Sequence, residues 1–276
     1  MPHSKQPASI KTRQASSLLL TSLITSLPGL ATLVSQGLTN AAFAQTNGPV
    51  AQVMPKQFLE RYYQGVTYFK AGDLDKALAA FRAVVISAPY DPMVHLSLAA
   101  VLHQSGDLEN AIAEYRRALS LRPADAFARM SLGGLLQSQG QLQEAVIEYD
   151  QAIKLRPDVV LFRLPLGIAL RIAGNKDEAI HELALVVAAY PENLKALSQL
   201  AATYQDKGQY QQAVKEYRKI LVHQPQNFSI QFNTGACLLA LKDYDQSIGA
   251  LTKAVQLDGS VPEAHALLGA AQSGRG

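Results

Sequence analysis

The sequence contains no tryptophan and only one cysteine, Cys237, so no disulfide can form within the chain and its stability must come from packing. Charged residues make up 17% of the chain and hydrophobic residues 48%, a balance too apolar for a disordered protein. A phosphate-binding loop, a GxSxG motif and a CxxC pair are all missing. The sequence therefore shows no catalytic motif.

Acidic residues are absent from the start of the chain, because none precedes Glu60. Lys5, Lys11 and Arg13 account for the whole formal charge of +3, so residues 45–276 are neutral overall. Proteins that bind nucleic acid carry a basic face or stripe. The charge balance thus argues against a nucleic-acid partner.

The first 44 residues have the order of a secretory signal peptide. Residues 1–17 are polar and basic, residues 18–34 are largely apolar, and Ala42 and Ala44 place small residues before Gln45. We expect cleavage after Ala44 and a periplasmic or extracellular location, with residues 45–57 as a flexible linker. The alternative is an uncleaved segment that anchors the protein to a membrane.

Prolines mark a repeat that fills the rest of the chain. They recur every 34 residues, at Pro89, Pro123, Pro157, Pro191 and Pro225. The preceding segments align, as in AGDLDKALAAF at 71–81 and SGDLENAIAEY at 105–115. A fixed period of this size indicates a repeat architecture in which each repeat is one supersecondary unit.

We number the positions of each repeat from residues 58, 92, 126, 160, 194 and 228. Positions 8 and 20 are always small, and position 24 is always Phe, Tyr or Leu, which predicts that the large side chain fills the gap left by the small ones. Position 15 is glycine in every repeat except the sixth, where it is Lys242. Glycine just beyond a helix adopts the left-handed conformation without strain, and proline at position 32 ends the second helix. Each repeat is therefore predicted to be helix A, a glycine turn and helix B.

This 34-residue pattern resembles the tetratricopeptide repeat. The resemblance implies an all-α fold, a right-handed α-solenoid with six repeats at 58–91, 92–125, 126–159, 160–193, 194–227 and 228–261. It also implies a capping helix and tail at 262–276. Tryptophan is absent from position 4 throughout, and the sixth repeat has Gly259 in place of the proline.

In this family the A helices line a concave groove that binds a ligand, and the resemblance carries that role to matching positions here. The first four repeats would offer an apolar groove for a peptide or an amphipathic helix. The expected groove residues are Leu59, Tyr62, Val66, Phe69, Met93, Leu96, His103, Phe127, Met130, Leu161, Leu164, Ile168 and Arg171. The alternative is that individual side chains pack against neighbouring helices instead.

Several other residues are of types that can serve as functional groups, but their spacing does not favour that role here. His95 and His103 lie eight residues apart, which is not a metal-ligand spacing, and we expect neither a metal nor a cofactor. Glutamate recurs at position 23 in four repeats, which predicts a solvated acidic row on the outer face. Pro165 lies inside the fourth helix A and is expected to kink it.

The leading hypothesis is a non-enzymatic scaffold for protein–protein interaction that assembles an envelope or secretion complex. The alternatives are a membrane-anchored assembly factor, the regulatory subunit of an enzyme, and self-association through the apolar groove. Membrane contact is expected only if the N-terminal segment is retained.

The intact mass of the native protein distinguishes a cleaved signal peptide from a retained anchor. We expect the mature chain to begin at Gln45, because signal peptidase requires small residues at the positions that Ala42 and Ala44 occupy. An intact mass that includes residues 1–44 would establish the anchor instead.

Overall fold

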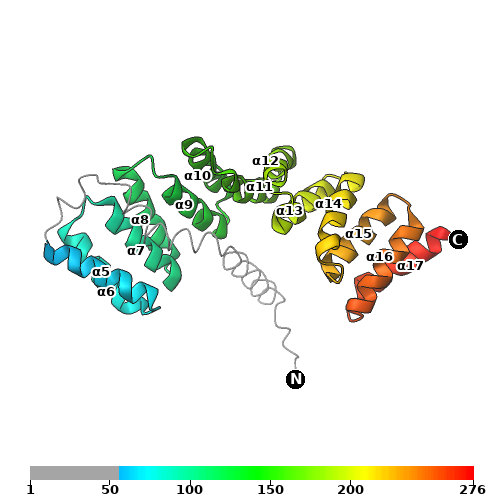
Figure 1. The fold of residues 1–276 in the computed structure, drawn as a ribbon, viewed down its shortest axis with the longest axis horizontal. Helices are drawn as coiled ribbons and strands as arrows, with labels where there is room; N and C mark the ends of the chain where they lie inside the picture. Colours follow the sequence, from blue (N-terminus) through cyan, green and yellow to red (C-terminus); the bar gives the residue numbers. More distant parts are fainter. Residues whose placement is uncertain (1–55) are drawn as a thin grey trace, which may run out of the picture. The chain divides into compact units, whose positions relative to one another are not determined.

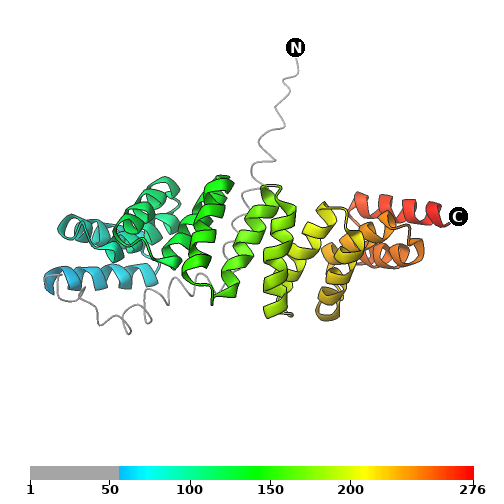
Figure 2. The ribbon, with the colours of Figure 1, turned by 90° about the horizontal axis from the view of Figure 1, so that it is seen from above.

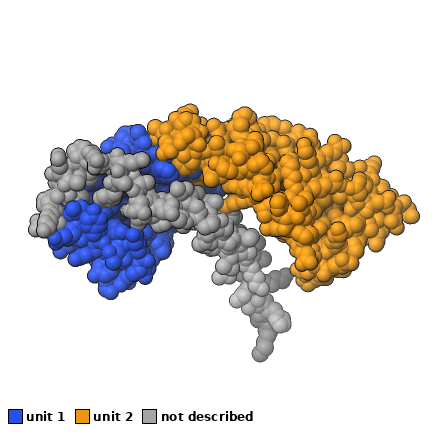
Figure 3. All heavy atoms as spheres, viewed as in Figure 1, with its two compact units in different colours: residues 1–139 blue, residues 140–276 orange. Residues whose placement is uncertain are grey.

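The computed structural model describes residues 56–276, and all of the regular structure in this part of the chain is helical (Figure 1). The expected signal peptide at 1–44 and most of the expected linker lie outside the described residues. The first helix begins at Lys56, two residues before the predicted start of the first repeat. The helices form two compact units, residues 1–139 and 140–276, and the boundary in the sequence falls within the third predicted repeat (Figure 3).

The described part of unit 1 is a stack of five helices, each packed against the next in chain order. They are α5 (Lys56–Lys70), α6 (Leu74–Ser87), α7 (Pro92–Ser105), α8 (Leu108–Leu121) and α9 (Ala126–Ser138). Helices α5, α7 and α9 are the predicted A helices, and α6 and α8 are B helices. Each helix is too short to be stable alone, so the packing of apolar faces must hold the stack together.

Unit 2 continues the same alternation, and its helices follow one another side by side in Figure 2. They are α10 (Leu142–Leu155), the 3₁₀ turn η2 (Val160–Phe162), α11 (Arg163–Ile172), α12 (Lys176–Ala189), α13 (Leu194–Asp206), α14 (Tyr210–His223), α15 (Phe228–Ala240), α16 (Tyr244–Leu257) and α17 (Pro262–Arg275). Here α11, α13 and α15 are A helices, and α17 lies where the A helix of a seventh repeat would.

The contact between positions 8 and 24 holds the two helices of a repeat together. A Cβ atom added at Gly65 would lie 3.0 Å from the ring of Phe81. At Gly167 it would lie 2.6 Å from Cγ of Leu183, closer than real Cβ contacts allow. The predicted filling of the gap by the large residue is thus confirmed in these repeats.

Position 20 of helix B is the second small position, and it is completely buried in all six repeats. Its residues are Ala77, Ala111, Ala145, Ala179, Ala213 and Ser247. Ser247 is the polar exception, and its hydroxyl donates a hydrogen bond of 2.8 Å to the carbonyl of Gly235 on the paired helix. That bond satisfies a hydroxyl that would otherwise be costly to bury.

The turn between helices A and B depends on a left-handed residue at position 15. Gly72, Gly106, Gly174 and Gly208 all have φ between 77° and 90°. Lys242 takes the same conformation, with φ of 62°, and is the only non-glycine residue with positive φ in the described chain. In the sixth repeat the lysine therefore adopts the left-handed conformation that the turn requires, at a cost of about 1 kcal/mol.

Side chains cap helices of both kinds. At the starts of the B helices, Asp73, Asp107 and Asp243 each accept a bond from a backbone N–H of the first turn, but Asn175 does not. The A helices have side-chain caps at position 34 that the sequence reading missed. These caps are Asp91, Asp125, Asn193 and Asn227.

Pro165 lies at the start of its helix and not inside it, contrary to expectation. The fourth repeat lacks a polar cap at Val159, and its A helix begins with η2 before α11 starts at Arg163. Pro165 is then the third residue of α11, within the first turn, where backbone N–H groups have no partner inside the helix. The late start of the helix therefore accommodates the proline.

The glutamates at position 23 are not a solvated row, which also corrects the expectation. Glu114 accepts a bond of 2.6 Å from Nδ1 of His95, and Glu182 accepts one of 2.6 Å from Arg163. Glu216 is 7% exposed and pairs with Lys219. The partners His95 and Arg163 occupy position 4, so these two contacts link helix A to helix B within a repeat.

Position 4 also joins one repeat to the previous one. Ring nitrogen Nε2 of the buried His95 lies 2.9 Å from the carbonyl oxygen of Pro89. Gln231 donates in the same way to the carbonyl of Pro225, at 2.9 Å. The side chain that replaces the usual tryptophan thus satisfies a carbonyl in the turn between repeats.

Substitution of two helical glycines by alanine separates close packing from helix propensity. Gly167→Ala should lower the free energy of unfolding by about 1–3 kcal/mol, because the new methyl group overlaps Leu183. Gly249→Ala on α16 is the matched control: its Cβ would meet no atom within 4 Å, and alanine should stabilise that helix by about 1 kcal/mol. Urea unfolding followed by circular dichroism measures both, and equal stabilisation by the two variants would contradict the packing argument.

Candidate functional site

The A helices present the inner face of each unit. Helix α5 contacts α7 in unit 1, and α11 contacts α13 in unit 2, although a B helix lies between them in the chain. Among the described residues, no two B helices contact each other as closely. The sides of the A helices that are turned away from the B helices therefore form one surface in each unit, called here the inner face of that unit.

The inner face of unit 1 is largely apolar. Phe127 is 38% exposed on α9, and the other large apolar side chains of this face are half-buried. These others are Leu59, Val66, Phe69, Met93 and Leu96. Tyr63, which is 46% exposed beside them on α5, was not among the expected groove residues. Partly exposed apolar side chains on successive helices form a surface that can bury an apolar ligand.

Charge is scarce on this face. Burial lowers the pKa of His103 below its ordinary value, so the imidazole is neutral at physiological pH. Met93 lies beside a cation, because its sulfur is 3.4 Å from Nη1 of Arg122. Lys70, at the end of α5, is exposed to solvent. A ligand on this face would be recognised chiefly by apolar contact.

Four of the expected groove residues belong to the core instead. Tyr62, Met130, Leu164 and Ile168 are each 6% exposed or less. The hydroxyl of Tyr62 is hydrogen-bonded to Ser97 on α7 at 2.9 Å, and its ring meets Phe81 edge-on at 5.5 Å between centroids. Position 5 thus points between adjacent A helices when its side chain is large and well packed, and a Tyr62→Glu change would disrupt the fold rather than test binding.

The inner face of unit 2 has a different character. Leu161 in η2 and Ile172 at the end of α11 are 41% and 53% exposed. Phe232 on α15 is half-buried and stacks on Phe228 with 5.9 Å between ring centroids. Helix α13, which lies between α11 and α15 in the stack, is polar on the same side, as its sequence indicated.

Polar contacts tie α13 to its neighbours. Arg171 on α11 donates to Asp206 at 2.9 Å, so this expected groove residue is held by an ion pair. The hydroxyl of Tyr217 on α14 donates to Oε1 of Gln205 at 2.9 Å. Burial raises the pKa of Tyr217, and the phenol therefore remains a neutral donor. These contacts fix the side chains at one end of α13.

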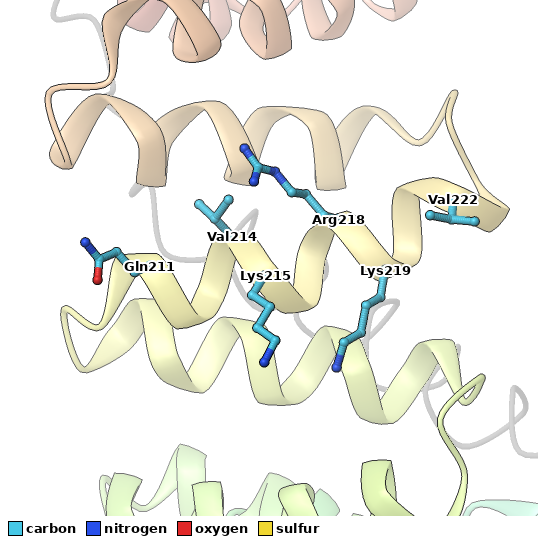
Figure 4. Close-up of a pocket in the computed structure, with 6 residues that line it drawn as sticks. All are labelled: Gln211, Val214, Lys215, Arg218, Lys219 and Val222. Atoms are coloured by element: carbon cyan, nitrogen blue, oxygen red, sulfur yellow. The ribbon is translucent and has the colours of Figure 1, made fainter.

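A shallow depression lies on the outer side of unit 2, along α14. Lys215 and Lys219 extend to one side of the helix and Arg218 to the other (Figure 4). Lys219 pairs with Glu216 at 2.6 Å, and Arg218 donates to Gln246 on α16. The lining comes from a single helix and most of its charges face solvent, so the inner faces are the better candidates for a site.

Two further features of residues 56–276 are the grouping of possible metal ligands and the length and apolarity of the helices. No group of three or more His, Cys, Asp or Glu side chains in this part of the chain could hold a metal ion. None of its helices combines the length and apolarity needed to cross a bilayer.

Stacked helix hairpins with exposed inner faces define the class of helical-repeat interaction scaffolds. Residues 62–129, 130–193 and 199–272 match a family model described as tetratricopeptide repeat. Because the match covers most of the sequence, the chain belongs to the tetratricopeptide repeat family. Proteins of this kind are protein-interaction scaffolds.

Solved structures share the fold at low sequence identity. YrrB, described as a TPR protein with an unusual peptide-binding site, is 20% identical with a TM-score of 0.62, covering 68% of this chain and 97% of that chain. PilW, a widely conserved type IV pilus biogenesis factor, is 19% identical with a TM-score of 0.61, covering 78% and 100%. A tetratricopeptide repeat protein from Parabacteroides merdae is 14% identical with a TM-score of 0.60, covering 79% and 100%. No curated protein matches the sequence.

Cys237 should behave as a structural thiol. It is 1% exposed on α15, and burial raises the pKa of its thiol to about 11, so the reactive thiolate is scarce. We expect Ellman's reagent to label the folded protein far more slowly at mildly alkaline pH than the same protein unfolded in guanidinium. Rapid stoichiometric labelling of the folded chain would instead indicate an accessible, activated cysteine.

Proposed function

We propose that this chain is a non-enzymatic scaffold that binds a peptide or amphipathic helix of a protein partner on the inner face of unit 1. The observation that carries the proposal is the set of partly exposed apolar side chains across α5, α7 and α9. Burial of such surface is worth about 25 cal/mol per Å², and aromatic and methionine side chains are favoured at interfaces.

An amphipathic helix suits the inner face of unit 1 because most side chains of this face are apolar, while Lys70 lies at the end of α5. Such a helix would present apolar residues at i, i+3, i+4 and i+7 and keep its polar side in water. Expulsion of water from Leu96, Val66 and Phe69 would supply the affinity. Lys70 at the end of α5 would contact the polar side.

We further propose that the protein acts outside the cytoplasm in the assembly of an envelope or secretion complex. The support is the order of charges, apolar residues and small residues in the first 44 positions. The structural likeness to PilW, a pilus biogenesis factor, is compatible with an assembly role but rests on the fold alone. A scaffold without catalytic motifs suits such a role.

Peptides that bind the full chain are first selected from a random displayed library. A charge placed on the inner face of unit 1 should weaken their binding. Leu96→Glu puts a carboxylate among half-buried apolar side chains and should weaken binding at least about tenfold, or about 1.4 kcal/mol. Fluorescence anisotropy measures the affinity.

The matched control is Ile86→Glu on α6, where the side chain is 82% exposed and lies on a B helix. This variant makes the same chemical change away from the inner face and should bind normally. Phe127→Glu provides a second inner-face variant with a more exposed side chain, in case Leu96→Glu lowers helical content. Unchanged binding by both inner-face variants would overturn the proposal.

A further inference from the structure

The polar side of α13 lies within an otherwise apolar inner face. Six residues on this side form what we call the α13 strip, and all six are polar or small: Lys195, Ser198, Gln199, Ala202, Gln205 and Asp206. Apolar side chains of the neighbouring repeats flank the strip: Leu161 in η2, Ile172 on α11 and Phe232 on α15. A ligand that crosses these helices therefore meets apolar, polar and apolar surface in turn.

Lys195 is the cation of this strip without a partner. Its side chain is half-buried, and no hydrogen bond or ion pair joins it to any described residue. Burial lowers its pKa, because the ammonium group has lost hydration without gaining a carboxylate. Other cations near the strip are already engaged: Arg171 pairs with Asp206, and Lys207 pairs with Asp177.

Gln199 adds unused hydrogen-bonding capacity one helical turn away, on the same side of α13 as Lys195. Its Oε1 is buried and accepts no hydrogen bond, and Nε of Arg171 is buried and donates none. Within residues 56–276 these are the two buried side-chain polar atoms without a partner, and both side chains belong to the inner face of unit 2. Buried polar atoms are almost always hydrogen-bonded. This face therefore has one acceptor and one donor that form no hydrogen bond within the described chain.

The spacing of the helices indicates which kind of ligand would fit this pattern. Packed helices lie about 8–10 Å apart, and an extended chain advances about 3.3 Å per residue, so about three residues separate successive A helices. We propose that the inner face of unit 2 binds an extended peptide whose acidic side chain pairs with Lys195 while apolar residues about three positions away on each side contact α11 and α15. This inference rests on the proposed function and adds a chemical specificity to the second unit.

A symmetric synthetic peptide tests the proposal without a choice of binding direction. The probe is acetyl-Leu-Ser-Ala-Glu-Ala-Ser-Leu-amide, compared with the same peptide carrying glutamine at the centre. On the full chain the glutamate peptide should bind about tenfold more tightly, and the difference should shrink as salt is raised. Fluorescence anisotropy of labelled peptides measures both affinities.

Substitution of Lys195 assigns the preference to this side chain. Lys195→Met keeps the length of the side chain and removes its charge, so both peptides should bind with equal affinity. Lys195→Arg should retain the preference. Lys215→Met is the matched control, because Lys215 belongs to the same repeat but is exposed on the outer side of α14 with no bonded partner, and this variant should discriminate like the parent.

A second comparison tests whether a side chain or a chain end supplies the carboxylate. The glutamine peptide with a free C-terminus should bind no better than its amidated form, and equal affinity with the glutamate peptide would show that a chain end is recognised instead. Equal binding of the amidated glutamate and glutamine peptides to the parent chain would overturn the proposal, as would failure of both to bind. Neither result affects the proposed function, which the Leu96→Glu and Phe127→Glu variants test on unit 1.

Discussion

The contact between a small residue of helix A and a large residue of helix B is the constraint on which the structure depends. At Gly167 and Gly235 even a methyl group would overlap the leucine of the paired helix, so the distance between the two helices is set by the absence of a side chain. Leucine at position 24 meets glycine in both of these repeats, whereas tyrosine at position 24 accompanies alanine at Ala99 and Ala201 and glycine at Gly133. The same contact recurs in each hairpin, so each repeat presents its A helix in a similar way.

The two units use this common scaffold to present different chemistry. The positions that face inward are free of the packing constraint, and they carry apolar side chains in unit 1 and a polar strip flanked by apolar residues in unit 2. Ion pairs at positions 4 and 23 and bonds to the carbonyl of the turn hold the hairpins without using these positions. The bonds that hold the hairpins together therefore involve other residues than those exposed on the inner faces.

Much of the hairpin was predictable because its determinants are local. Glycine at position 15, aspartate at the start of a B helix and proline at position 32 act through the backbone within a few residues. Pro165 was misjudged because the start of its helix depends on the missing cap at Val159 and the 3₁₀ turn that follows. Tyr62 was assigned to the groove because its position usually faces inward, but its ring packs on Phe81 and its hydroxyl reaches Ser97 in the next repeat.

The sequence by itself determined the period, the alternation of helices and turns and the membership of the repeat family, because each follows from residues that act at short range or recur at a fixed spacing. Only the tertiary structure decided which inward positions are exposed, since burial depends on contacts between helices far apart in the chain. It also decided that Glu114 and Glu182 bind partners on helix A and that Lys195 has none, because such pairs join residues that are distant in the sequence and close in the fold. Short-range chemistry thus sets the hairpin, and the packing of hairpins selects the side chains available to a ligand.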